Sequence, residues 1–257
     1  MNEVKPTQKK RRKGRIILLI IAAVLLALVV GTWVYLQTYY HADAQAVAAI
    51  ETTQAVEIRQ AAGRIDFVPR EAQAGLIFYP GAKVEFTAYA PLMHACAERG
   101  VLCVLLEMPG NLAVLDYNAA DGIAEDYPEI DRWYVGGHSL GGNIAATYAA
   151  HHADALAGLV LLAAYSTDDL TGTQLQTLSV YGTEDGVLNR DRYEKYRENL
   201  PADTVEVVIE GGCHSYFGSY GMQQGDGAPS VTRDAQIRQT VDALCALVDP
   251  AAADSAA

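Results

Sequence analysis

The stretch Trp133-Tyr-Val-Gly-Gly-His-Ser-Leu-Gly-Gly-Asn143 decides how this chain folds. Its first three residues are apolar and predict a buried strand, and the alanine-rich sequence 143–151 predicts a helix. Between them, residues 137–141 form the pattern Gly-x-Ser-x-Gly. Glycines on both sides permit a sharp turn from strand to helix, because a Cβ at those positions would clash with the neighbouring chain. Such a turn would lift the hydroxyl of Ser139 above the sheet edge, where it could act as a nucleophile.

An acid and a histidine follow at the ends of two later predicted strands. The strand 177–181 leads into a turn that contains Asp185, and the strand 205–209 leads to His214. The order Ser139, Asp185, His214 matches the chain order of one known class of serine-based catalytic triads. His214 would accept the proton of Ser139, while Asp185 would fix the imidazole tautomer and stabilise the imidazolium. We therefore predict that these three residues form a catalytic triad.

Other ionisable residues are weaker candidates. Asp168 and Asp169 follow the strand 159–163 and form the alternative position for the acid. His138 lies on the same tight turn as Ser139, so its ring is expected to pack or hydrogen-bond rather than to act as the base. Cys213 adjoins His214 in a loop, but Ser139 already supplies the nucleophile. The remaining histidines follow no late strand: His41, His94, His151 and His152.

Four stretches of the chain resemble the α/β-hydrolase superfamily, and within it the small, lidless bacterial group called alpha/beta hydrolase fold-5. They span most of the sequence from 74 to 248. The resemblance implies a serine hydrolase with an oxyanion hole, and it implies no particular substrate. The stretches are Phe78-Tyr-Pro-Gly-Ala-Lys-Val84, Gly136–Gly142, Tyr181–Gly186 and His214-Ser-Tyr-Phe-Gly218 with its continuation through Gly225-Asp226-Gly227.

The oxyanion hole is expected to use two backbone N–H groups. One belongs to Leu140, the residue after the nucleophile. By resemblance the second is the N–H of Ala82, with Lys83 as the alternative. Gly81 would let the backbone approach closely, and Pro80 would stiffen the entry to this loop.

Apolar strands alternate with helical stretches along the chain, which predicts a mostly parallel sheet with helices on both faces. The resemblance implies that this sheet has the α/β-hydrolase fold. An antiparallel pair, 56–58 with 65–68, is expected at one edge. About a dozen residues, 164–176, join the strands before the acid, which leaves no room for a helical lid and predicts an open, shallow pocket. The parallel strands are expected at 76–79, 101–106, 133–135, 159–162, 178–181 and 205–209.

The segment 216–230, rich in glycine and aromatic residues, precedes a final amphipathic helix near 231–248. Two interpretations are open. The segment is either an ordered loop packed by its own side chains, or it forms a wall of the substrate pocket. The aromatic residues concerned are Tyr216, Phe217 and Tyr220.

The N-terminal sequence predicts a membrane anchor. Residues 16–36 carry no charge and would span about 31 Å as a helix, enough to cross a bilayer core. A basic segment, 1–15, precedes them, and aromatic residues cluster at 33–40, which predicts a cytoplasmic N-terminus and an extracytoplasmic catalytic domain. A cleavable signal peptide ending near Ala42-Asp-Ala44 is the rival interpretation, although its apolar region would be unusually long.

The remaining boundaries are a stalk at 37–53, a hydrolase domain at 54–249 and a disordered, alanine-rich tail at 250–257. Residues 16–257 hold 12 Lys and Arg against 30 Asp and Glu, a formal charge of −18 that disfavours nucleic acid and anionic lipid surfaces as ligands. No cluster has metal-ligand spacing, and no cofactor is expected. Four cysteines, at 96, 103, 213 and 245, permit three full pairings or remain free thiols.

Together these features predict a membrane-anchored, extracytoplasmic serine hydrolase of carboxylesterase type. It would cleave an ester, thioester or lactone through an acyl-enzyme. Two alternatives remain: an acyltransferase that uses the same triad, and a non-catalytic binding module that has kept the fold. The intact triad argues against the binding module, because such a module has no chemical need for all three groups.

Overall fold

The computed structural model describes residues 7–249, which divide into two compact units between Thr38 and Tyr39. The first unit contains α1 (Thr7–Gln37), and its part Gly14–Gln37 is long and apolar enough to cross a membrane. The length of this apolar run agrees with the anchor expected at 16–36, although helices of this kind also occur as signal sequences. The predicted tail, 250–257, lies outside the described residues.

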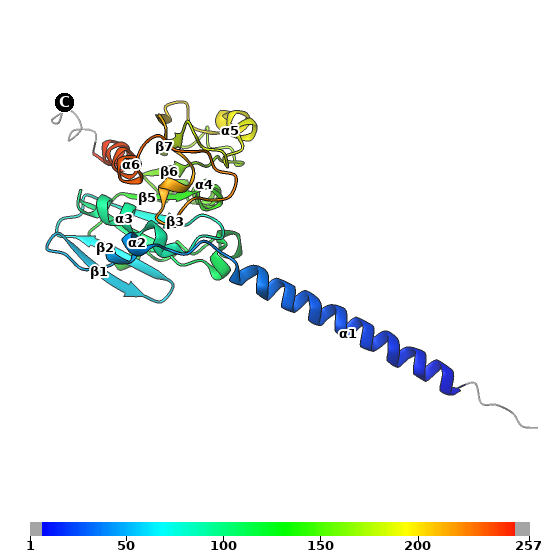
Figure 1. Ribbon diagram of the computed structural model, residues 1–257. Coiled ribbons are helices and arrows are strands. Elements are labelled where there is room, and N and C mark those ends of the chain that lie inside the picture. Colours follow the sequence, from blue (N-terminus) through cyan, green and yellow to red (C-terminus); the bar gives the residue numbers. More distant parts are fainter. Residues whose placement is uncertain (1–6, 250–257) are drawn as a thin grey trace, which may run out of the picture. The chain divides into compact units, whose positions relative to one another are not determined.

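The second unit is built around an eight-stranded sheet (Figure 1). The strand order is β1-β2-β4-β3-β5-β6-β7-β8, antiparallel from β1 to β4 and parallel from β4 to β8. This arrangement confirms the mostly parallel sheet and the antiparallel edge pair. The strands are β1 (Val56–Ala61), β2 (Arg64–Pro69), β3 (Ala74–Tyr79), β4 (Val101–Leu106), β5 (Trp133–His138), β6 (Gly158–Leu162), β7 (Gln176–Gly182) and β8 (Val205–Ile209).

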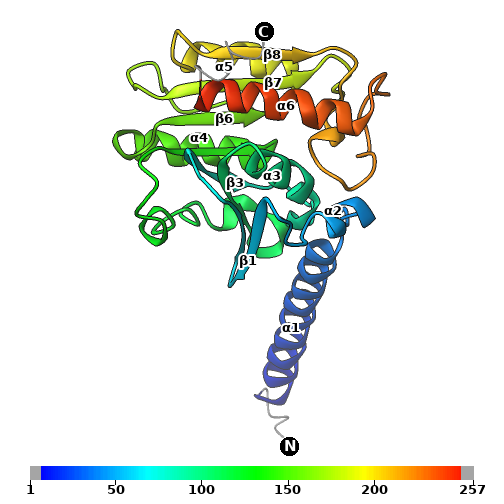
Figure 2. The ribbon, with the colours of Figure 1, turned by 90° about the vertical axis from the view of Figure 1, so that its left-hand side faces the viewer.

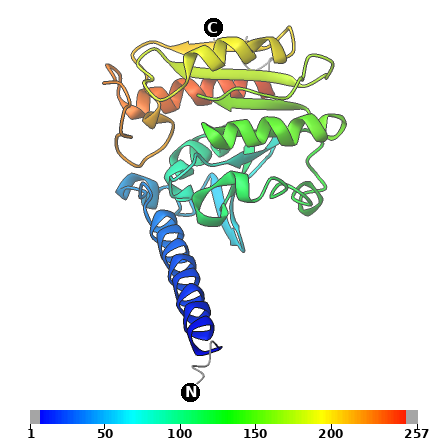
Figure 3. The same cartoon turned by 90° about the vertical axis from the view of Figure 1, so that its right-hand side faces the viewer.

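Helices cover both faces of the sheet, as the alternating apolar pattern predicts. One face carries α3 (Ala90–Ala97) and α6 (Arg233–Val248) (Figure 2). The other carries α4 (Leu140–His151) and α5 (Arg190–Tyr196) (Figure 3). Seven short 3-10 helices lie in the connections: Phe86–Tyr89, Pro109–Asn111, Ala113–Leu115, Ala124–Asp126, Ala153–Ala155, Arg197–Asn199 and Ser215–Phe217.

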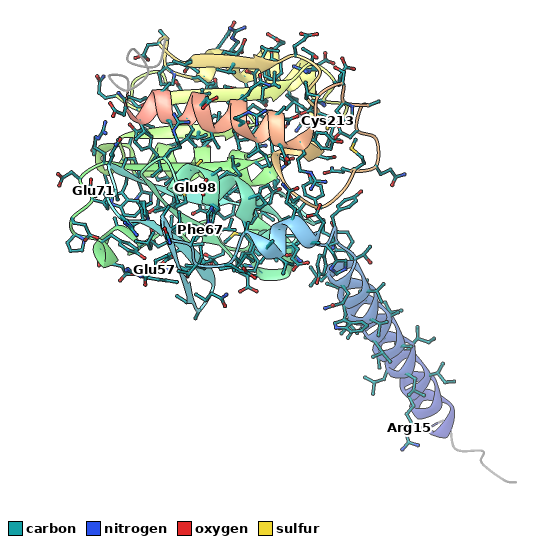
Figure 4. All side chains as sticks on the ribbon, turned by 60° about the vertical axis from the view of Figure 1, so that its left-hand side comes forward. Arg15, Glu57, Phe67, Glu71, Glu98 and Cys213 are labelled. Atoms are coloured by element: carbon teal, nitrogen blue, oxygen red, sulfur yellow. The ribbon has the colours of Figure 1, made fainter. Side chains whose placement is uncertain are left out.

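The sheet separates two apolar cores, because neighbouring side chains of a strand point to opposite faces. Phe78 packs with α3 and α6 in one core, whereas Ile77 packs with α4 in the other. Strands β3, β4, β5 and β6 are buried along their whole length, which explains their continuous apolar runs. Side chains at the β1–β2 edge divide differently: Phe67 of β2 is buried, and Glu57 of β1 is exposed (Figure 4).

The connection between β6 and β7, residues 163–175, contains no helix in the part of the chain that the structure describes. It runs as an irregular loop, so no lid is inserted there. This matches the expectation drawn from its length.

The segment predicted as a stalk, 37–53, differs from expectation. From Tyr39 onward the chain belongs to the compact unit. The N–H of Tyr40 donates to the carbonyl of Lys83, and its carbonyl accepts the N–H of Glu85. Asp43 then caps the short helix α2 (Ala44–Ala48). These backbone hydrogen bonds join the segment to a loop some 40 residues away in sequence, a pairing that no local pattern encodes.

Candidate active site

Ser139 lies at the junction of β5 and α4, in a backbone conformation that L-residues rarely adopt. Its φ is 54° and its ψ is −124°. The N–H of Ser139 donates to Leu162 O of β6 at 2.9 Å, and its carbonyl accepts the N–H of Asn143 at 3.1 Å. A residue held in such a region costs on the order of 1–3 kcal/mol, so the surrounding structure must enforce it. The predicted strand-to-helix turn is therefore present, and α4 begins three residues earlier than expected.

Glycines make this turn possible, as the sequence predicts. A Cβ on Gly137 would lie 2.6 Å from the carbonyl oxygen of Tyr79. A Cβ on Gly141 would overlap the carbonyl oxygens of Tyr79 and Pro80, and one on Gly142 would overlap the methyl group of Ala164. The elbow is thus wedged between β3 and the chain that follows β6.

Asp185 and His214 form a buried pair at the carboxyl ends of β7 and β8. His214 Nδ1 lies 2.9 Å from Asp185 Oδ2, and the two residues are 1% and 7% exposed. Asp185 Oδ1 accepts the N–H groups of Val187 and Leu188 at 2.9 and 2.7 Å. Since the carboxylate oxygen can only accept, Nδ1 of His214 carries a proton and Nε2 of the neutral ring is the free basic nitrogen.

His214 and Ser139 line the same cavity of about 200 Å³. Within the described residues, His214 Nε2 has no hydrogen-bond partner. Hydrogen bonds between a nucleophile and its base are often long before substrate binds, and they tighten in the complex. The cavity is also lined by Leu140, Asn143, Ala163, Tyr165, Val187, Leu188 and Asn189.

One candidate oxyanion donor lies in the elbow, and the other lies on an adjoining loop. Leu140 is the first residue of α4 and lines the cavity, and the close contact between Pro80 and Gly141 brings the loop that carries Ala82 beside it. The alternative donor, the N–H of Lys83, already donates to Asn111 O at 2.8 Å. That bond leaves Ala82 as the better candidate. Together these groups could bind a tetrahedral oxyanion formed at Ser139.

A buried tyrosine and His138 connect the oxyanion loop to the elbow, and sequence reasoning did not identify this link. Tyr89 Oη accepts the N–H of Gly81 at 3.1 Å and lies 2.8 Å from His138 Nδ1. The phenol of Tyr89 thus bridges the backbone of Gly81 and the ring of His138. Burial, followed by the nearby His214, holds the pKa of His138 well below its usual value. His138 is therefore a neutral packing and hydrogen-bonding residue, as predicted.

The alternative acids and the cysteines considered from the sequence do not join the Asp185–His214 pair. Asp168 accepts a hydrogen bond from Thr147 Oγ1 at 2.7 Å, and Asp169 accepts two from Thr171. Neither pairs with His214. All four cysteines are free thiols, and burial raises the pKa of Cys213 to about 12, which keeps it in the unreactive thiol form. Cys213 lies in the loop between β8 and α6 (Figure 4).

The aromatic residues of the segment 216–230 do not line the cavity beside Ser139. Phe217 and Tyr220 are buried in the core shared with α3 and α6. This favours the interpretation of an ordered loop over that of a pocket wall. Within the residues that the structure describes, no group of three His, Cys, Asp or Glu side chains is placed to hold a metal ion.

Comparison with known proteins agrees with this fold. A family model described as "Alpha/beta hydrolase family" matches residues 75–238. No curated protein matches the sequence. Among solved structures, the chain is similar to a protein from Thermoplasma acidophilum described as a predicted CIB-like hydrolase, with 16% identity, a TM-score of 0.53, and coverage of 74% of this chain and 97% of that one.

Two further structures share the fold. Dienelactone hydrolase from Anabaena variabilis is 14% identical, with a TM-score of 0.55 and coverage of 74% of this chain and 97% of that one. A soluble variant of monoglyceride lipase from Saccharomyces cerevisiae is 12% identical, with a TM-score of 0.54 and coverage of 78% and 97%. At such low identity these likenesses establish the fold alone.

A mostly parallel sheet whose central strand ends in a serine elbow defines the class of α/β hydrolases. The chain belongs to the alpha/beta hydrolase family, because the family model covers well over half of it. The fold expected from the sequence is thereby confirmed.

The close packing of the elbow predicts that Gly141→Ala destabilises the protein by about 1–3 kcal/mol or more, since backbone atoms rather than flexible side chains would have to move. Gly172→Ala is the matched control, because a Cβ there meets nothing within 4 Å. The free energy of unfolding of the full chain, measured in urea and detergent, should change by less than about 1 kcal/mol in that control. Equal losses in both variants would contradict the described elbow.

Proposed function

We propose that this protein is a membrane-anchored, extracytoplasmic serine hydrolase that cleaves a carboxylic ester, thioester or lactone. The observation that carries the proposal is the buried Asp185–His214 pair, whose free Nε2 belongs to a residue lining the same cavity as Ser139. The strained backbone of Ser139 supports it, because strain of this kind persists where a side chain must be presented for chemistry.

In the first step, Ser139 Oγ would attack the substrate carbonyl while His214 Nε2 accepts its proton. The negative charge then moves onto the carbonyl oxygen, where the N–H groups of Leu140 and Ala82 would stabilise it. Asp185 keeps the imidazole oriented and stabilises its positive charge. The bond to the leaving group breaks, and that group takes the proton from His214 as the acyl-enzyme forms.

In the second step, His214 would accept a proton from water, whose oxygen attacks the acyl-enzyme carbonyl. Collapse of the second tetrahedral intermediate breaks the bond to Ser139 Oγ, which recovers its proton from His214, and releases the carboxylic acid. Removal of one oxyanion donor in such sites typically costs about 10²–10³ in turnover.

The N-terminal sequence supports the proposed location. The apolar helix Gly14–Gln37 follows a run of basic residues, a pattern that retains the N-terminus in the cytoplasm. The acidic side chains that follow, among them Glu57, Glu71 and Glu98, lie exposed on the second unit (Figure 4).

A fluorophosphonate probe should label the wild-type protein at Ser139, because an activated serine attacks phosphorus as it attacks a carbonyl. Ser139→Ala should abolish labelling, and His214→Ala should lower kcat for p-nitrophenyl acetate by at least about 10³-fold. Ser179→Ala is the control: this buried serine bonds to Tyr193 Oη and does not line the cavity, so its labelling should persist. A folded wild-type protein that takes no label would refute the proposed activity.

The size of the cavity predicts a preference for short acyl groups. Typical ligand pockets measure about 300–1,000 Å³, whereas this one holds about 200 Å³. We expect kcat/KM for p-nitrophenyl butyrate to exceed that for the decanoate by about tenfold or more. Leu188→Ala enlarges the cavity and should reduce this ratio, while Leu170→Ala, buried outside it, should leave the ratio unchanged. Equal rates for both esters in the wild type would contradict the prediction.

The proposed anchor predicts that the full chain stays in the membrane fraction after an alkaline carbonate wash and is released by detergent. Mass spectrometry of the extracted protein should give the intact 27.6 kDa chain rather than a product cleaved near Ala44. In right-side-out vesicles, added protease should digest the hydrolase unit, whereas inverted vesicles should protect it. A soluble, shortened product would identify the segment as a cleaved signal peptide instead.

A further inference from the structure

The segment 216–230 carries one side chain with an unusual number of partners. The carboxylate of Asp226 accepts five hydrogen bonds. Oδ1 accepts the N–H groups of His214, Gly186 and Gly227 at 3.1, 3.2 and 2.9 Å. Oδ2 accepts the N–H and the hydroxyl of Ser215 at 2.7 and 2.6 Å. A carboxylate has about four lone-pair sites, so this one is fully used.

These partners belong to two different loops. Gly186 directly follows Asp185 in the loop after β7, and His214 and Ser215 lie in the loop after β8. Strands β7 and β8 are parallel neighbours, so the chain that connects their loops runs back through α5 before β8 begins. This connection does not fix the distance between the two loops. Other bonds between the loops occur before these residues, from Thr183 N to Ile209 O and from Glu184 N to Gly212 O. Asp226 supplies the hydrogen bonds that join the two loops at Gly186, next to Asp185, and at His214 itself.

The chain around Asp226 is shaped for this close approach. Gly225 has a φ of +88°, and a Cβ on Gly227 would overlap the carbonyl oxygen of Glu184. Burial alone would raise the pKa of Asp226, but the hydrogen bonds from Ser215, Gly186 and His214 hold it below its usual value. The side chain is therefore a carboxylate at neutral pH, and hydrogen bonds to a charged acceptor are roughly twice as strong as neutral ones.

We propose that Asp226 is a positioning residue that holds the loops of Asp185 and His214 at the separation their hydrogen bond requires. It does not line the cavity beside Ser139, so it acts through those residues and touches no substrate. This inference rests on the proposed function. The positioning role explains the sequence Gly225-Asp226-Gly227, which a loop packed only by its own side chains would not require.

The direct test is Asp226→Asn in the full-length protein. Asparagine keeps the size of the side chain but replaces one acceptor oxygen with an NH₂ group. In one orientation this group would face the N–H of Ser215, and in the other it would face the N–H groups of His214 and Gly186, so donor would meet donor in both. We expect kcat for p-nitrophenyl acetate to fall about 10–100-fold with KM changed less than about threefold, because small misplacements of catalytic groups carry costs of this size. The loss should be larger for ethyl acetate, whose alkoxide must be protonated by His214 as it leaves.

The matched control is Asp66→Asn, which also converts a buried carboxylate to an amide. Asp66 lies on β2, separated from β7 by four strands, and accepts the hydroxyl of Tyr127 at 2.6 Å. This variant should lose stability without loss of kcat at a temperature where it remains folded. Asp226→Asn combined with Asp185→Asn should lower kcat by much less than the product of the two separate losses, since both changes act through His214.

The results distinguish a failure of the positioning role of Asp226 from a failure of the proposed function. A kcat of Asp226→Asn within twofold of wild type, an equal loss in Asp66→Asn, or losses that multiply fully in the double variant would each overturn the positioning role while wild-type activity stands. A wild-type protein that neither reacts with fluorophosphonate nor hydrolyses esters would overturn the proposed function, and this inference with it.

Discussion

The backbone of Ser139 is the constraint on which the rest of the candidate site depends. A φ of 54° in a residue with a side chain is unfavourable by itself, and it is held by hydrogen bonds to β6 and α4. Those bonds form only if β3, β5 and β6 approach the turn closely, which the glycines at 137, 141 and 142 allow. The close approach of three central strands thus holds this one residue in its unfavourable conformation.

The site is assembled from loops that leave the same edge of the sheet. Parallel strands place all their carboxyl ends together, so residues far apart in sequence meet there. The sheet alone places these site residues only approximately. Side chains such as Tyr89, which joins Gly81 to His138, set the finer geometry between loops. Gln236 of α6 does the same for the His214 loop, since its amide bonds to both the N–H and the carbonyl of Cys213.

Much of this architecture could be predicted from the sequence, because apolar runs and glycine patterns are local signals. The eight strands, the elbow and the short β6–β7 connection all follow from residues close together in the chain. The pairing of Asp185 with His214 was predicted from their positions after two neighbouring strands. Three features could not be predicted. The segment 37–53 was expected to be a stalk, yet Tyr40 pairs with Lys83 and Glu85. Tyr89 and Asp226 likewise act through contacts between distant residues, which leave no periodic pattern.

The irregular connection at 163–175 has a consequence for the fate of an acyl-enzyme. With no lid inserted in that described stretch, and with Ser139 only half-buried, the intermediate would stand in contact with bulk solvent. Any acceptor alcohol would then compete with water at its full concentration, and would need a binding site of its own to prevail. In the proposed hydrolase, the shortness of this loop would therefore favour release of a free acid over transfer to an alcohol.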